Sequence, residues 1–163
     1  MPLTPFHLGP ALFFGLLLFR YLNFPAFLVA NVIVDIEPFF VLFLGLQYPL
    51  HGFFHSFLGG TVLGVVTAVG IYLLRDWSNK ILAMFKVQQK SSFTQIFYTS
   101  VLGVHLHIFL DSFLYSEMNP FYPLAGNPLL NVVGFSAVYE FCAVSFIFGL
   151  ILYVYKLMTS KEV

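Results

Sequence analysis

The sequence predicts an all-α protein, a polytopic transmembrane helical bundle, and two observations support this class. Sixty per cent of the 163 residues are hydrophobic and only 9% are charged, whereas a soluble domain of this length needs far more polar surface. The apolar residues also form runs of roughly 20, the length at which a helix crosses a bilayer. We therefore expect one integral membrane domain over residues 1–163. The first residues lack the basic segment of a cleavable signal peptide, so we expect none.

Apolar runs predict about five membrane-spanning helices, over residues 6–22, 24–46, 53–74, 93–115 and 132–155. The second run contains Asp35, Glu37 and Pro38. Proline removes a helical hydrogen bond and clashes with the preceding turn, so this helix should break near its middle. Asp35 and Glu37 would point to nearly opposite sides of an unbroken helix. They can serve one site only if the helix is broken there, as membrane helices are where they line a cavity.

The later runs predict packing and connections. Gly60, Gly64 and Ala68 recur every four residues in the third run and predict a close approach to another helix. Residues 75–92 are polar and basic, so we expect an interfacial connection there. Residues 116–131 are rich in proline and should lie over one mouth of the bundle.

The basic residues predict the orientation in the membrane. With five spans, all seven fall on one side of the bilayer: Arg20, Arg75, Lys80, Lys86, Lys90, Lys156 and Lys161. Lysine and arginine are enriched on the cytoplasmic side. We therefore expect a multi-pass protein of the cell membrane with its N-terminus outside and its C-terminus in the cytoplasm.

Ionisable residues inside the apolar runs predict a functional site, because such residues are costly in a membrane and mark functional positions. His107 and Asp111 are four apart and share a helix face, and His51 and His55 repeat this spacing. His105 cannot share the face of His107, so we expect it either to support a ligand or to have a structural role. The five-span arrangement places all five histidines and four acids in the outer half of the bundle, namely His7, His51, His55, His105, His107, Asp35, Glu37, Asp111 and Glu140.

Nitrogen and carboxylate ligands at this spacing predict a divalent metal, for which Zn²⁺ is the commonest choice and Mn²⁺ or Fe²⁺ are alternatives, with one or two ions bound. We interpret His55, His107 and Asp111 as ligands, and Asp35 could bridge two metals. A bound metal lowers the pKa of water to about 7 and polarises a carbonyl or phosphoryl oxygen. Glu37 or Glu140 is then a general base or a further ligand. Taken alone, His7 is equally compatible with a packing role.

The chain resembles the membrane-bound metal-dependent hydrolases, an inner-membrane-associated family of bacteria and archaea. The resemblance rests on Thr4-Pro5-Phe6-His7, Asp35-Ile36-Glu37, residues 51–56 and His107-Ile108-Phe109-Leu110-Asp111. It implies metal binding by His7, Asp35, His51, His55, His107 and Asp111. The family often has Asp-x-Asp where this chain has Asp35-Ile36-Glu37. It also commonly has an arginine and a threonine where this chain has Gly52-Phe53-Phe54, so the phosphate clamp that an arginine supplies is missing there.

These observations predict a hydrolase that acts on a lipid or lipid-linked ester or phosphoester from the extracytoplasmic leaflet. A looser similarity of the His-x-x-x-Asp element to zinc-dependent phospholipases C favours the phosphoester. A metal-ion or proton transporter is the alternative, although nothing ionisable continues the path inward apart from Glu140. A non-catalytic membrane scaffold is the third hypothesis. Near-zero net charge argues against nucleic acid as a partner, and the sequence leaves a homo-oligomer open.

Overall fold

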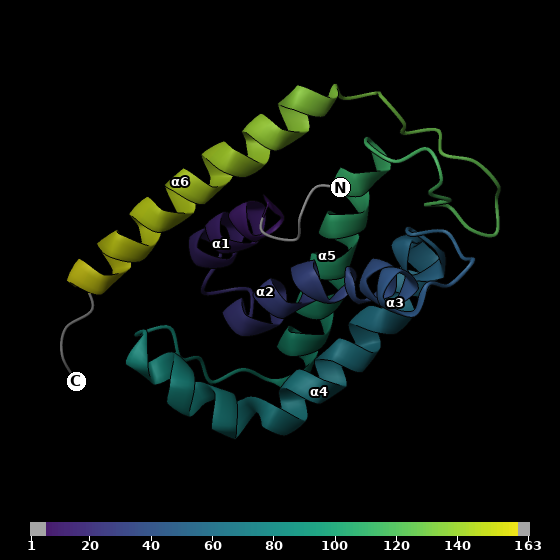
Figure 1. Ribbon diagram of the computed structural model, residues 1–163. Helices are drawn as coiled ribbons and strands as arrows, with labels where there is room; N and C mark the ends of the chain where they lie inside the picture. The colour runs from purple at the N-terminus through teal and green to yellow at the C-terminus, as the bar shows by residue number, and fades with distance from the viewer. Residues whose placement is uncertain (1–5, 160–163) are drawn as a thin grey trace.

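The computed structural model describes residues 6–159, and every regular element in this part of the chain is helical. The predicted all-α class is therefore confirmed. In chain order the elements are α1 (Leu8–Leu17), α2 (Phe24–Ile33), α3 (Ile36–Leu44), the short 3₁₀ helix η2 (Phe53–His55), α4 (Phe57–Met84), α5 (Phe93–Ser112) and α6 (Phe135–Thr159). Figure 1 shows α1 lying along α6, and α5 crossing α2 with its first turns beside α4.

Four helical segments are long and apolar enough to cross a membrane: Phe24–Leu44, Phe57–Met84, Phe93–Ser112 and Phe135–Thr159. The first predicted span, over residues 6–22, is the exception: its helix, α1, has only ten residues. At ~1.5 Å per residue such a helix covers about half of a ~30 Å hydrocarbon core. The described residues thus form four candidate spans and one short apolar helix. Orientation in the membrane stays a prediction, and Lys161, one of its basic residues, lies outside the described residues.

The second span is broken, as predicted, but upstream of Pro38. The α2 helix ends at Ile33 and α3 begins at Ile36, so Pro38 lies in the first turn of α3. Proline is tolerated in a first turn because the amide it lacks would have no helical partner there. Asp35 consequently sits at the break, where its side chain is not confined to the face of a continuous helix.

Close helix contacts occur where glycine was predicted to permit them. A Cβ atom on Gly64 would come within 3.0 Å of the Val101 backbone, which brings α4 against α5. On the other side of the bundle, a Cβ atom on Gly9 would overlap the carbonyl oxygen of Cys142, because α1 lies directly on α6. The core between α2 and α5 is formed by Ala30, Val34, Val104, Ile108 and Met118.

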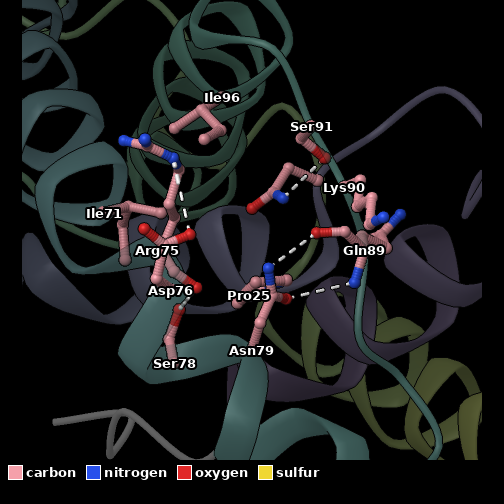
Figure 2. A pocket seen from close by; sticks show the side chains of 11 residues that line it. Pro25, Ile71, Arg75, Asp76, Ser78, Asn79, Gln89, Lys90, Ser91 and Ile96 are labelled. Carbon is pink, nitrogen blue, oxygen red and sulfur yellow. Dashed lines mark hydrogen bonds and ion pairs between the residues drawn. The ribbon is translucent and has the colours of Figure 1, made fainter.

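The basic connection is shorter than predicted, because α4 continues ten residues beyond position 74, to Met84. A polar pocket of about 140 Å³ lies between its second half and the segment before α5. Figure 2 shows Asn79 facing Gln89 there: the Asn79 amide donates to the Gln89 carbonyl (3.0 Å) and accepts from the Gln89 amide (3.2 Å). The Gln89 side chain also donates to the carbonyls of Phe19 and Leu22. Gln89 therefore joins the second half of α4 to the segment between α1 and α2.

Candidate metal centre

Four side chains from three parts of the chain converge in the bundle. Asp35 lies at the α2–α3 break, His55 ends η2, and His107 and Asp111 are on α5. One nitrogen or oxygen atom from each lies within 4.8 Å of the corresponding atoms of the others. His55, His107 and Asp111 are almost completely buried, whereas the Asp35 side chain is 18% exposed. We call these four residues the cluster.

Local sequence features hold the cluster in place. On α5, the four-residue spacing puts the His107 Nε2 atom 3.1 Å from Asp111 Oδ2. Gly103 allows α2 to approach α5, since a Cβ atom there would lie 2.7 Å from that of Ala30. The side chain of Ser56 caps α4 by accepting from the amide of Gly59 (3.0 Å), a common N-terminal arrangement. That cap fixes the turn that carries His55.

A backbone carbonyl decides the tautomer of His107. Its Nδ1 atom lies 2.7 Å from the carbonyl oxygen of Asn31. A carbonyl can only accept, so Nδ1 carries the proton and the lone pair of the neutral ring is on Nε2. That lone pair faces oxygen atoms of Asp111 and, at 3.6 Å, of Asp35.

His55 is oriented in the same way by a carboxylate. Its Nδ1 atom donates to Glu37 Oε2 (2.8 Å), which leaves Nε2 facing Asp35 and Asp111, each 4.0 Å away. Burial lowers the pKa of His55 below its ordinary value, against the opposing effect of the Glu37 hydrogen bond. The neutral ring is the form that binds a metal.

The two inward-facing imidazole nitrogens of the cluster have no hydrogen-bond partners. The Nε2 atoms of His55 and His107 are buried and unpartnered, and the carboxylate atoms nearest to them are Oδ1 of Asp35 and Oδ2 of Asp111. These are acceptors facing acceptors, and burying such groups without compensation is costly. A divalent cation would satisfy all of them, and two imidazoles with two carboxylates suit zinc or a similar first-row metal. The residues therefore fit a metal ion, whose identity they leave open.

His7 borders the cluster without belonging to it. Its Nε2 atom is 3.1 Å from Asp111 Oδ1, and its ring lies 4.1 Å from that of His107, centroid to centroid. His7 is buried just before α1, and it is available as a further ligand. Thr4 and Pro5, which contribute to the family resemblance, lie outside the described residues.

His51, a ligand by the resemblance, has another partner. Its Nδ1 atom donates to Glu117 Oε1 (2.7 Å), and its ring stacks on Tyr115 at 3.7 Å. Burial opposes ionisation of Glu117, but the hydrogen bond from His51 prevails and lowers the pKa of that carboxyl. Within residues 6–159, the ring of His51 meets the cluster in a T-shaped contact with the ring of His55, 4.7 Å between centroids. The structure thus places it between the cluster and the loop that contains Glu117.

Glu37 touches the cluster, but its oxygens are already engaged. They accept hydrogen bonds from His55 Nδ1 and from the backbone amides of Gly52 (3.1 Å) and Phe54 (3.2 Å). A carboxylate in this position orients a metal-binding imidazole and raises its basicity. Its contacts therefore favour a positioning role over the general-base role predicted for it.

Glu140 is not brought to the cluster. The buried stripe of α6 consists of Val138, Cys142, Ser145 and Gly149, whereas Glu140 is exposed. Two residues of a helix correspond to roughly 200° of rotation, so Glu140 points away from the side that Val138 buries. The predicted catalytic role of Glu140 is corrected on this ground.

The expected structural role of His105 is confirmed. Its Nε2 atom lies 2.9 Å from the Thr61 hydroxyl and 3.2 Å from the Phe57 carbonyl, so it joins α5 to α4. Two residues that support the site were not predicted. Asn31 acts through its backbone carbonyl, so its side chain carries no signal of this role in the sequence. Glu117 carries no signal either, because its partner His51 is 66 residues away.

Comparisons with protein-family models, curated proteins and solved structures give no match to this chain.

Proposed function

We propose that this protein is a membrane-embedded, metal-dependent hydrolase of a lipid or lipid-linked ester, with its site toward the extracytoplasmic side. One observation carries the proposal: the unpartnered Nε2 atoms of His55 and His107 converge with carboxylate oxygens of Asp35 and Asp111 between apolar helices. Ionisable groups are retained in membrane segments mainly for function. The resemblance to membrane-bound metal-dependent hydrolases agrees with this proposal.

The four cluster residues would hold the metal, with His7 as an additional donor. Zn²⁺ is the proposed ion, and Mn²⁺ or Fe²⁺ would use the same donors. A metal in such a site polarises the substrate carbonyl and makes water a nucleophile at neutral pH.

The chain's own residues supply orientation and access. Asn31 and Glu37 fix the two imidazole rings through Nδ1. Asp35 is the most exposed member of the cluster. Its Oδ2 atom is buried without a hydrogen-bond partner, so it would accept a hydrogen bond from a water held inside the cluster. Water would arrive from a pocket of about 240 Å³ that His51 and Ser56 line together with Glu117, next to the His55 turn.

The test is a product assay on purified protein in lipid nanodiscs. The protein is stripped with a chelator, reloaded with zinc, manganese or iron, and incubated with ester lipids, and released fatty acids or headgroups are identified by mass spectrometry. We expect release by metal-loaded wild type, none after stripping, and none by His107→Ala. Glu140→Gln is the control and should retain activity, since Glu140 is exposed away from the cluster. Metal-loaded wild type that releases no more product than His107→Ala would refute the proposal.

A further inference from the structure

An apolar groove opens on the outer surface of α2 and α3, where the two helices meet. It has a volume of about 340 Å³ and is lined by Val29, Val32, Ile33, Asp35, Ile36 and Phe39. This volume falls within the ~300–1,000 Å³ range of small-molecule sites. Five of the six lining side chains are hydrocarbon, and the sixth is the cluster carboxylate.

The groove faces the hydrocarbon part of the bilayer. Its lining residues belong to the candidate span Phe24–Leu44. Asp35 is the twelfth of these 21 residues, which places it about 17 Å along a span that must cross a core of ~30 Å. At this depth the groove meets lipid chains rather than water.

Asp35 connects the groove to the cluster. Its side chain is 18% exposed, whereas the side chains of His55, His107 and Asp111 are at most 2% exposed. The groove is lined by no other cluster residue. A carboxylate at the bottom of a hydrocarbon groove in mid-membrane is costly. Its location there is accounted for if a polar group of a bound lipid has to reach it.

Charge further restricts what can bind. In the described part of the chain, no lysine or arginine lines the groove or pairs with a cluster residue. The pocket that contains Arg75 and Lys90 lies at the opposite end of α5 from His107 and Asp111, beside Ile96. The two cluster carboxylates would offset the charge of a bound divalent metal, so a phosphate brought to Asp35 would meet neither a net positive site nor an arginine clamp. An uncharged ester carries no such penalty.

We propose that the groove binds an acyl chain of an uncharged ester lipid of the diacylglycerol type. The lipid enters sideways from the membrane, and its ester carbonyl lies beside Asp35. Acyl-chain binding stands independently of catalysis, whereas assignment of the ester as substrate rests on the proposed function. Hydrolysis adds water across the acyl C–O bond, so the products are a fatty acid and the corresponding alcohol.

Photo-crosslinking tests the groove without reference to catalysis. Wild type in nanodiscs receives diacylglycerol with a diazirine in one acyl chain, and adducts are mapped by mass spectrometry. Val29→Trp fills the groove, and Val69→Trp on α4 is its matched control, since the two valines are 39% and 44% exposed. We expect adducts concentrated on residues 29–39, reduced about tenfold by Val29→Trp and little changed by Val69→Trp. Should Val29→Trp lose its metal and thus its fold, Ile36→Trp fills the same groove and should give the same result.

Two results would overturn acyl-chain binding in the groove: adducts spread evenly over α4 and α6, or adducts that are unchanged in Val29→Trp and Ile36→Trp. Crosslinks from residues 29–39 to a second copy of the chain would overturn it as well. A second arm compares hydrolysis of diacylglycerol with that of phosphatidic acid, where we expect product only from the former. Labelling of the groove without any hydrolysis would refute the proposed function but not the acyl-chain site. Preferred cleavage of phosphatidic acid would overturn the assignment of an uncharged substrate.

Discussion

At the scale of single residues, the chemistry depends on which ring nitrogen of each histidine faces inward. His55 and His107 both donate through Nδ1, to Glu37 and to the Asn31 carbonyl, and both present Nε2 to the carboxylates. These outer hydrogen bonds fix ligand orientation before a metal arrives, and loss of such a partner typically lowers metal affinity about 10–100-fold.

Glu37→Gln tests this outer contact. Glutamine keeps the shape of the side chain but removes the charge that holds the His55 ring. We expect zinc affinity to fall about 10–100-fold, as measured by competition with a chromophoric chelator. Glu140→Gln makes the same chemical change on an exposed helix surface and should leave affinity unchanged. Equal affinities in the two variants would show that Glu37 does not position His55.

His51→Asn separates the family-implied ligand set from the one observed. Because His51 pairs with Glu117 rather than with Asp35 or Asp111, we expect His51→Asn to retain the wild-type zinc content. His107→Asn should lose it, since Nε2 of His107 faces both carboxylates. Elemental analysis of the purified variants gives the answer. Loss of zinc from His51→Asn would return that residue to the ligand set.

The residues of the cluster could be predicted from the sequence, but the roles of the residues around it could not. The four-residue spacing of His107 and Asp111 is a local property and could be predicted. His51 and His55 show the same spacing, yet only His55 joins the cluster, because η2 and the cap at Ser56 replace a continuous helix there. The partner of each Nδ1 atom depends on contacts between distant segments, which no local pattern reveals.

At the scale of helices, α1 is held against α6 by backbone proximity at Gly9. Gly9→Ala would force a methyl group into the Cys142 carbonyl, so we expect a loss of roughly 1–3 kcal/mol of stability. Gly70→Ala on α4 is the control, because nothing lies within 4 Å of the added Cβ. It should raise stability by about 0.5–1 kcal/mol. Thermal unfolding in detergent compares the two, and similar melting temperatures would contradict the packing described here.

Helix faces were the least predictable feature of the chain. A membrane helix is apolar on the lipid side as well as on the packed side, so hydrophobic periodicity does not reveal which face is buried. Glu140 was assigned to the site on depth alone, and its rotation about α6 places it outside. Asp35 and His107 were assigned to the site on the same basis and do reach it, because the α2–α3 break and this face of α5 are turned toward the centre of the bundle.

At the scale of the whole molecule, the cluster connects the α2–α3 break, the η2 turn and α5 through one point. The metal should therefore hold together segments that are distant in sequence, and its loss should loosen all of them. The helical class and the four helices long enough to cross a membrane were predictable from the composition and the apolar runs. The shortness of α1 was not, because the apolar run continues past the end of that helix.

Acidification should release the metal. Its ligands bind as neutral imidazoles and ionised carboxylates, so protons compete with the ion. Burial lowers the pKa of His55 below the ordinary histidine value of about 6.5, so we expect affinity to decline at a pH below that value and to recover when pH is raised again. Equilibrium dialysis against zinc at a series of pH values measures this. Affinity that is constant down to about pH 5 would argue against imidazole ligands.

X-ray absorption spectroscopy of zinc-loaded protein tests the central claim most directly. The account predicts one zinc per chain with nitrogen and oxygen ligands at about 2.0–2.1 Å, including the scattering of two imidazoles, and loss of the imidazole signal in a His55→Ala, His107→Ala double variant. Zinc bound well below one per chain, or a ligand shell without imidazole, would contradict it.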